Sequence, residues 1–152
     1  MSINWSLKEF SALTVDELYA IIQLRNEVFV IEQQCVFQDA DGKDPHAWHL
    51  MGFNENNQLA AYTRLLPAGA SFAEASIGRV VSAGFARNSG IGKKLMTESI
   101  SCIYKLFGKQ PIKIGAQLYL KRFYESFGFI QVSEVYLEDG IPHIYMLKNL
   151  LS

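Results

Sequence analysis

A glycine-rich turn, Arg87-Asn88-Ser89-Gly90-Ile91-Gly92-Lys93, lies between an apolar segment over residues 77–82 and an amphipathic segment over residues 93–107. The first segment is typical of a buried strand and the second of a helix. A turn that enters a helix in this way leaves several backbone N–H groups unpaired, where the helix dipole also favours an anion. The two glycines let a phosphate approach closely, and Arg87 and Lys93 add positive charge. The stretch therefore predicts a pyrophosphate cradle, although glycines after a strand also form ordinary tight turns.

Two familiar phosphate-binding motifs do not fit this turn. A P-loop needs a glycine, four further residues and then Gly-Lys-Ser/Thr, but Arg87 stands at the first glycine and Lys94 at the hydroxyl that would hold Mg²⁺. The dinucleotide fingerprint GxGxxG also fails, because Leu95 stands where the third glycine belongs. The pattern that remains is Arg-x-x-Gly-x-Gly.

The composition limits the class of protein. The chain has 152 residues, of which 49% are hydrophobic, so it can bury a core, and we expect one domain over residues 1–152. A net charge of −1 gives no indication of nucleic-acid binding. Arg25 and Glu27 interrupt the most apolar helical segment, so we expect no membrane span. Cys35 and Cys102 are too few for a disulfide scaffold and too isolated for a zinc site, which favours a cytoplasmic protein with reduced thiols.

The hydrophobic pattern predicts elements in the order β-α-β-β-β-α-β-α-β-β. Thr14-Val15-Asp16-Glu17 is a capping box that opens the first helix, whose apolar stripe extends to Phe29. The acidic loop over residues 33–47 is best interpreted as a solvated turn. Predicted strands cover residues 3–7, 48–53, 59–66, 77–82, 112–116, 129–136 and 143–147, and the second and third helices cover 93–107 and 118–127. This order favours an α/β fold, in which a single domain has a mixed β-sheet flanked by helices.

A second motif lies downstream of the glycine-rich turn. It runs from Gln117 to Phe129, and its helix ends in Tyr-x-x-x-Gly-Phe after a polar residue seven positions before the tyrosine. Together with Arg-x-x-Gly-x-Gly, this pattern resembles the GNAT superfamily of N-acetyltransferases. The resemblance covers nearly the whole chain, because the order of elements also matches. Residues 28–33, 77–81 and 138–143 are similar to the ElaA-like branch of that superfamily.

The resemblance implies an acyl-CoA N-acyltransferase that needs no metal. Such an enzyme moves an acetyl group from acetyl-CoA to a primary amine of a small molecule or peptide, by direct attack in a ternary complex. The pantetheine arm would lie as a pseudo-strand along the backbone of Val80, Val81 and Ser82. Gln117 replaces the asparagine that usually binds this arm. The pyrophosphate would occupy the cradle made by Arg87, Asn88, Ser89, Gly90, Ile91, Gly92 and Lys93.

The resemblance also suggests how protons are handled. Tyr124 occupies the position of the phenol that protonates the departing thiolate, and a tyrosine that merely packs in the core is the alternative. No motif fixes the general base. His143 is the first candidate and His49 the second, because imidazole titrates near neutral pH. Glu32 is a further candidate on the substrate side, since it lies near the end of the first helix.

Arginines on two consecutive predicted strands suggest a binding site for the acceptor. Arg64 and Arg79 could clamp a substrate carboxylate, and the alternative is a structural ion-pair network with Asp41 and Asp44. The spacing of Arg25, the two aspartates and Arg64 also resembles the N-terminal half of the acyl-homoserine-lactone synthases, which share the GNAT fold. This chain is shorter than those enzymes, so synthase activity is the less favoured interpretation.

Other chemistries have weaker support. Cys35 has no histidine beside it to assist an acyl-cysteine route. His46 and His49 with nearby aspartates resemble a metal site only superficially, because Leu50 stands where a calcium loop needs its glutamate. A non-catalytic acyl-CoA-binding domain is the main alternative to an enzyme. The sequence is compatible with a homodimer, and it does not identify the acceptor amine.

Overall fold

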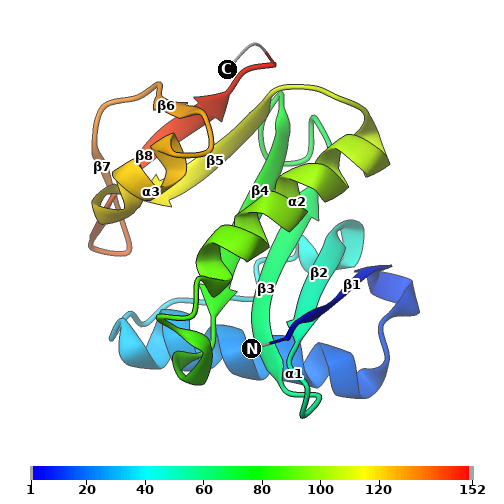
Figure 1. Ribbon diagram of the computed structural model, residues 1–152. Helices are drawn as coiled ribbons and strands as arrows, with labels where there is room; N and C mark the ends of the chain where they lie inside the picture. Colours follow the sequence, from blue (N-terminus) through cyan, green and yellow to red (C-terminus); the bar gives the residue numbers. More distant parts are fainter. Residues whose placement is uncertain (1, 151–152) are drawn as a thin grey trace.

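The computed structural model describes residues 2–150, and its elements follow the predicted order closely (Figure 1). The strands are β1 (Asn4–Glu9), β2 (Trp48–Phe53), β3 (Leu59–Leu66), β4 (Ala75–Ser82), β5 (Ile112–Gln117), β6 (Phe129–Gln131), β7 (Tyr136–Glu138) and β8 (Ile141–Lys148). The α-helices are α1 (Val15–Arg25), α2 (Ile91–Phe107) and α3 (Lys121–Glu125). Helix α1 continues into a π-helical segment, η2 (Asn26–Glu32), and short 3-10 turns cover Phe10–Ala12, Asp44–His46, Gly84–Ala86 and Leu118–Leu120.

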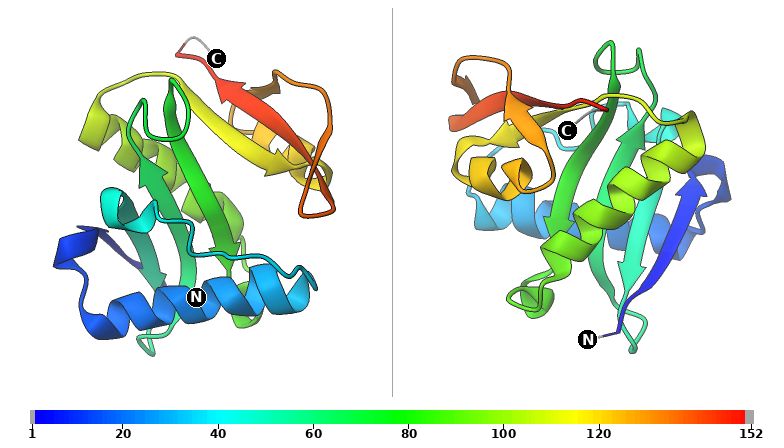
Figure 2. Two further views of the ribbon diagram at one scale, coloured as in Figure 1. Left: turned by 180° about the vertical axis from the view of Figure 1, so that it is seen from behind. Right: turned by 45° about the horizontal axis from the view of Figure 1, so that its top comes forward.

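The strands form one mixed sheet in the order β1-β2-β3-β4-β5-β8-β6, and β7 pairs with the first part of β8. Within residues 2–150, β4 and β5 are the one parallel pair, and the other pairs are antiparallel. Helix α2 crosses one face of the sheet and α1 lies across the opposite face (Figures 1 and 2). Among the described residues, every helix is too short or too polar to cross a lipid bilayer. This architecture confirms the predicted mixed α/β fold.

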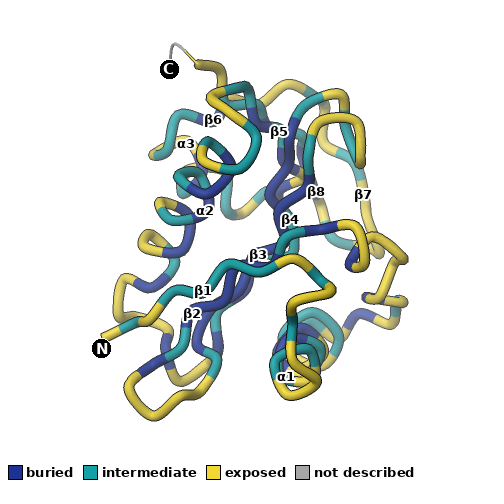
Figure 3. The backbone as a smooth tube through the Cα atoms, turned by 90° about the vertical axis from the view of Figure 1, so that its right-hand side faces the viewer, coloured by how far each residue is buried: buried dark blue, intermediate teal, exposed yellow. Residues whose placement is uncertain are grey.

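Apolar side chains form a core on each face of the sheet. The larger core lies between the sheet and helices α2 and α3, and includes Leu95, Ile103 and Phe129. The smaller core lies under α1 and includes Ile21 and Leu24. Helix α1 is therefore buried on its sheet side and exposed on the other (Figure 3). Each fully buried leucine or isoleucine contributes about 1.5–3 kcal/mol to folding by leaving water.

The first helix begins at the predicted capping box. The Thr14 hydroxyl accepts the backbone N–H of Glu17 at 3.0 Å, and the Glu17 carboxylate accepts the backbone N–H of Thr14 at 2.9 Å. After Arg25 the helix widens into η2, a change that the apolar stripe did not predict. π-Helical turns are rare and occur often at functional sites. Here the widened segment brings Val28, Phe29 and Glu32 to the edge of the main cleft.

Strand β4 departs from regular pairing on both of its sides. Toward β3, Tyr62 pairs with Val81 and Arg64 pairs with Gly78, so β4 has one extra residue and forms a bulge. Arg79 lies in this bulge with a φ of +51°, in the left-handed region that costs a non-glycine residue about 1–2 kcal/mol. Toward β5, β4 pairs at only two positions, through Ala75 and Ser76. The two strands then diverge, and the edge of β4 beyond Ser76 is left unpaired by β5.

The chain between α3 and β8 differs from the prediction. We predicted one strand over residues 129–136, whereas the structure has two short strands, β6 and β7, separated by a loop. The hydroxyl of Ser133 accepts the backbone N–H of Tyr145 at 2.9 Å, in place of a strand carbonyl. This hydrogen bond to a side chain replaces a backbone one and ends β6. The chain pairs with β8 again only from Tyr136 onward. The predicted helix over residues 118–127 is likewise a 3-10 turn followed by the shorter α3.

Candidate functional site

The main cleft lies where β4 and β5 diverge. It has a volume of about 580 Å³, and it is bounded by β4, β5, the end of η2 and the turn between β7 and β8. Its walls include backbone and side chains of Arg79, Val80, Val81 and Ser82 on β4, and of Gly115 and Gln117 on β5. The remaining lining residues are Val28, Phe29, Glu32, Gln33, Cys35, Phe37, Arg87, Tyr119, Leu120, Glu138, Asp139, Ile141 and His143.

The glycine-rich turn joins β4 to α2 at one end of this cleft. Gly90 caps α2 with a φ of +79°, which a glycine adopts without steric cost, and the helix begins at Ile91. The first helical hydrogen bond to the cap runs from the N–H of Lys94 to the carbonyl of Gly90. The N–H groups of the turn before Lys94 have no partner within the helix, and the positive end of the helix dipole lies there. The local geometry is that of an anion-binding helix N-terminus.

Arg87 reaches across the cleft from this turn. Its Nη1 and Nη2 donate to the two carboxylate oxygens of Glu32 at 2.7 and 2.9 Å, and Nη2 also donates to the carbonyl of Ser82 at 3.2 Å. The guanidinium hydrogen bond lowers the pKa of Glu32 below its ordinary value. Both side chains remain about 40% exposed. Glu32 is thus placed beside the cradle, opposite the residue predicted to bind pyrophosphate.

Gln117 lies at the end of β5, where the strand faces the cleft. Its side-chain amide donates to Oε1 of Gln33 at 3.2 Å. Nearby, the thiol of Cys35 donates to the carbonyl of Asp139 at 3.3 Å. The structure therefore brings Gln117 together with Arg87 and the β4 edge in one cleft.

Tyr124 lies on α3, behind the wall of the cleft. The residue is 5% exposed and packs edge-on against the rings of Phe123 and Phe129. Burial raises the pKa of its phenol above the ordinary value for tyrosine. Tyr119, which the sequence analysis did not single out, lines the cleft on the same side. The Tyr124 phenol is therefore protonated at neutral pH, and Tyr124 is not among the described residues that line the cleft.

His143 lines the cleft opposite the cradle. It pairs with Gln117 across β5 and β8, and its ring stacks on Tyr136 with centroids 5.8 Å apart. Nδ1 lies 2.7 Å from the carbonyl of Ile141, which can only accept, so Nδ1 carries the proton in this hydrogen bond. The neutral ring then has its lone pair on Nε2, which lies 3.5 Å from Oε2 of Glu138. This arrangement leaves Nε2 able to accept a proton.

His49, the second predicted base, does not lie at the cleft. It is fully buried, Nε2 lies 2.9 Å from the carbonyl of Asp44, and Nδ1 lies 2.7 Å from the hydroxyl of Tyr62. Since the carbonyl can only accept, Nε2 donates to it and Nδ1 accepts from the tyrosine. Burial lowers the pKa of His49 below its ordinary value. Both nitrogens are occupied, so the geometry corrects the sequence interpretation and gives His49 a structural position.

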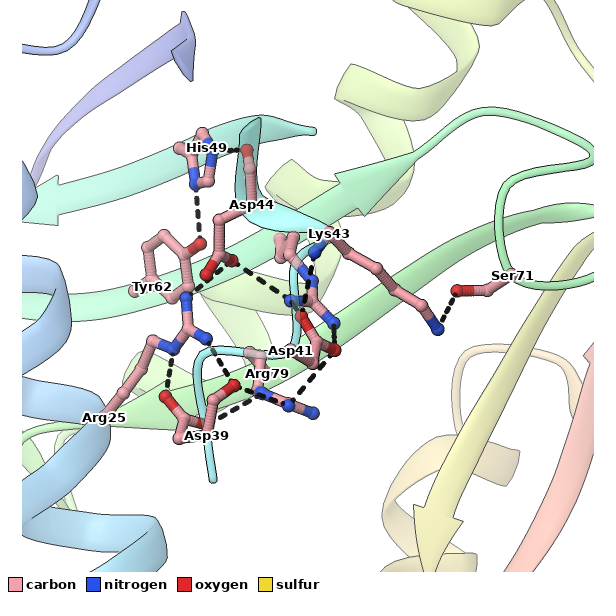
Figure 4. Close-up of polar contacts among 10 residues, drawn as sticks. Arg25, Asp39, Asp41, Lys43, Asp44, His49, Tyr62, Ser71 and Arg79 are labelled. Atoms are coloured by element: carbon pink, nitrogen blue, oxygen red, sulfur yellow. Dashed lines mark hydrogen bonds and ion pairs between the residues drawn. The ribbon is translucent and has the colours of Figure 1, made fainter. Parts of the chain in front are cut away.

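The predicted carboxylate clamp is largely replaced by an ion-pair network (Figure 4). Arg64 donates from Nη1 and Nη2 to the two carboxylate oxygens of Asp41, at 2.7 and 2.8 Å, and also binds Asp44. Burial by itself would raise the pKa of Asp41, but the Arg64 guanidinium holds it well below the ordinary range. Arg64 is buried, and both of its terminal nitrogens are engaged by Asp41 and Asp44, which leaves neither of them for a substrate carboxylate. The acidic loop is consequently anchored to the sheet and is not the solvated turn that we expected.

The rest of the network links the first helix to the bulge in β4. Arg25 binds Asp39 and Asp44 with contacts of 2.6 and 2.8 Å. Arg79 Nε lies 2.8 Å from Asp39 Oδ1, an ion-pair contact whose angle is not that of a hydrogen bond. Arg79 also donates to the carbonyl of Asp39 at 2.9 Å. Unlike Arg64, Arg79 keeps part of its side chain exposed at the cleft. The sequence analysis did not place Asp39 in the network, because its partners Arg25 and Arg79 are distant from it in the chain.

Comparisons with known proteins agree with this geometry. A family model described as an acetyltransferase (GNAT) domain matches residues 13–150. Protein ElaA of Escherichia coli (strain K12) is 41% identical over 151 residues, which cover 98% of each chain. The crystal structure of Escherichia coli ElaA matches with a TM-score of 0.91 and covers 97% of this chain and 100% of that one. A crystal structure of an acyl-CoA N-acyltransferase from Pseudomonas aeruginosa is 44% identical, with a TM-score of 0.92 over 97% and 99% of the two chains. An aminoglycoside 6′-N-acetyltransferase complexed with coenzyme A, 15% identical with a TM-score of 0.70, shares the fold over 95% and 97% of the two chains.

Proposed function

This chain belongs to the acetyltransferase (GNAT) domain family, and from that premise we propose that it moves an acetyl group from acetyl-CoA to a primary amine of a small molecule or peptide. One observation carries the proposal. Arg87, in the glycine-rich turn that leads into the N-terminus of α2, lines the same cleft as the unpaired edge of β4. A ligand with an anionic end and an amide-containing arm fits both features at once.

The donor would be bound mainly by backbone groups. Its pyrophosphate would sit on the first-turn N–H groups of α2, with Arg87 and Lys93 beside it. The pantetheine amides would pair with Val80, Val81 and Ser82, along the edge that β5 leaves unpaired. Gln117 would contribute its side-chain amide from the opposite wall. The divergence of β4 and β5 supports this placement, because it opens a slot between two otherwise adjacent strands.

The chemistry would be a direct transfer. The amine nitrogen attacks the thioester carbonyl carbon, the carbon–sulfur bond breaks, and the thiolate leaves with the electron pair of that bond. The acid Tyr124 would supply the thiolate with a proton, and burial keeps this phenol protonated at neutral pH. His143 would take the proton that the amine loses, through the lone pair of Nε2. The products are an N-acetylated acceptor and coenzyme A.

Donor binding and turnover test this function separately. Acetyl-CoA at 100 times its Kd should stabilise the folded chain by about 2.7 kcal/mol and raise its Tm. A panel of amines should then release free thiol in the presence of the chain. A rise in Tm without thiol release from any amine would support the alternative of a non-catalytic acyl-CoA-binding domain. No rise in Tm at saturating acetyl-CoA would contradict both functions.

Substitution of the proposed acid tests the mechanism. Tyr124→Phe should lower kcat by about 10²–10⁴-fold while the Kd for acetyl-CoA stays within about two-fold, because only the transferable proton is lost. Tyr104→Phe is the matched control, since Tyr104 also packs against the larger core but lies on another helix, α2. Steady-state rates with binding titrations measure both quantities. Full turnover by Tyr124→Phe, under conditions in which chemistry limits the rate, would remove Tyr124 from the mechanism.

A further inference from the structure

Residues 32–35, which we call the strap, begin at the last residue of η2 and contact three separate parts of the cleft. Glu32 binds Arg87 on the cradle with both carboxylate oxygens. Gln33 accepts from the side chain of Gln117 on β5. Cys35 donates to the carbonyl of Asp139, in the turn between β7 and β8. The strap therefore ties the cradle, β5 and the C-terminal turn together across the cleft that all of them line.

These contacts use the polar groups that the donor would need. The Arg87 guanidinium is taken by a carboxylate, whose geometry is similar to that of a phosphate. The Ser82 carbonyl, at the free edge of β4, already accepts from Arg87 Nη2 at 3.2 Å. The Gln117 amide is taken by the side-chain carbonyl of Gln33, which resembles a pantetheine amide carbonyl. Three proposed donor contacts are thus satisfied within the chain itself.

We propose that the strap competes with the acyl donor, so that Glu32 and Gln33 set the affinity of the chain for it. This inference rests on the proposed function, because it assumes that acetyl-CoA binds in this cleft. Binding would exchange the Glu32 carboxylate for the pyrophosphate on Arg87 and the Gln33 carbonyl for pantetheine on Gln117. The exchange is accessible, since both members of the Glu32–Arg87 pair are about 40% exposed. An exposed ion pair of this kind is weak, so it lowers donor affinity without preventing binding.

Removing the competing carboxylate should tighten donor binding. Glu32→Gln should lower the Kd for acetyl-CoA roughly two- to five-fold, the range that corresponds to losing an exposed ion pair. Glu27→Gln is the matched control. Glu27 is an exposed carboxylate on η2 that forms no ion pair among residues 2–150, and its substitution removes the same charge from the same segment. Isothermal titration of the three chains with acetyl-CoA measures the difference.

Fragments of the donor separate the two contacts. Glu32→Gln should also tighten binding of 3′-phospho-ADP, the part of coenzyme A that carries the pyrophosphate. Gln33→Ala should tighten binding of acetyl-CoA and leave the Kd for 3′-phospho-ADP at the wild-type value, because the Gln33 side chain hydrogen-bonds to Gln117 on β5 and not to Arg87. In the wild-type chain, acetyl-CoA should accelerate backbone hydrogen exchange at Gln33 and Cys35. Their N–H groups now donate to the carbonyls of Val28 and Val30.

The results distinguish the strap from the function on which it depends. If Glu32→Gln binds acetyl-CoA more weakly than the wild type, or if acetyl-CoA slows exchange in the strap, the strap holds the donor and our proposal is wrong. Equal Kd values for Glu32→Gln and Glu27→Gln would also overturn it. If the wild-type chain binds no acetyl-CoA at all, the proposed function itself has failed. Hydrogen exchange without ligand would then show whether Glu32→Gln loosens the strap.

Discussion

Arg25 is a fully buried guanidinium, and each of its nitrogens has an acceptor. Nε and Nη1 donate to the carboxylates of Asp39 and Asp44, and Nη2 donates to the carbonyl of Asp39 at 3.1 Å. The desolvation of such a charge is costly, and it is offset only while all these contacts are made. Burial opposes the charge, yet the hydrogen bond that Arg25 donates to Asp44 and the nearby carboxylates raise the pKa of Arg25 above its already high value. Arg25 therefore stays charged, and the buried carboxylates of Asp39 and Asp44 depend on it as an ion-pair partner.

Removal of this guanidinium should strongly destabilise the folded chain. Arg25→Met should lower the free energy of unfolding by about 3–5 kcal/mol, because Asp39 and Asp44 would remain buried with fewer partners. Urea denaturation at pH 7 measures the change. Arg122→Met provides the control, since Arg122 is exposed on α3 and has no ion pair among residues 2–150, and it should change stability by less than about 0.5 kcal/mol. A loss below about 1 kcal/mol in Arg25→Met would contradict a tightly coupled network.

At the level of single residues, the sequence was informative where a motif fixed a position. Arg87 and Gln117 line one cleft, and Gly90 caps α2, because their motifs have fixed spacing relative to a strand and a helix. His49 could not be assigned in the same way. Its burial depends on Tyr62, which only the pairing of β2 with β3 brings beside it. Residue type alone did not distinguish this buried histidine from His143.

At the scale of the element, the two glycines of the glycine-rich turn differ in whether their backbone conformation requires glycine. Gly90→Ala should lower the free energy of unfolding by about 1–2 kcal/mol, because a φ of +79° is strained for alanine. Gly92→Ala should be neutral or stabilising by up to about 1 kcal/mol, since its Cβ would meet only the ring of Phe123 at 3.5 Å in a helical turn. Thermal unfolding of the two variants without ligand tests this contrast. Equal losses in both variants would show that backbone conformation is not the deciding factor.

Element boundaries followed from the sequence where local signals agreed. Strands β2 and β3 have the predicted bounds, because alternating apolar runs flank a polar hairpin turn, and the turn residue Asn57 adopts a φ of +58°. The break between β6 and β7 was not predictable from the pattern. It depends on a hydrogen bond between Ser133 and Tyr145, which are separated in sequence and adjacent only in the sheet.

Across the whole molecule, buried ionisable groups should make stability depend on pH in two steps. The folded-state pKa of His49 is lowered, so the unfolded chain binds a proton that the folded chain does not as pH falls below about 6.5. The folded-state pKa values of Asp41 and Asp44 are also lowered, so their contribution is complete above about pH 4 and is lost as pH falls further. Stability should therefore decline gently from pH 7 to 5 and steeply below 4.

Urea denaturation at several pH values measures both steps. His49→Gln should remove most of the decline between pH 7 and 5, because glutamine does not titrate, while the steep loss below pH 4 remains. The overall stability of that variant is a separate quantity, and the comparison uses only the slope with pH. An unchanged slope between pH 7 and 5 would assign the first step to a group other than His49.

The short pairing between β4 and β5 influences the order in which parts of the molecule unfold. Two paired positions join a half-sheet made of β1–β4 to one made of β5–β8, and the larger core contains residues of both halves. Few backbone hydrogen bonds must break to separate the halves, so their parting should require less free energy than the unfolding of either. We expect the amides of β5 and β8 to exchange as one cooperative unit, ahead of those in β2 and β3. The junction between β4 and β5, which opens to admit a ligand, would then also be the place where unfolding begins.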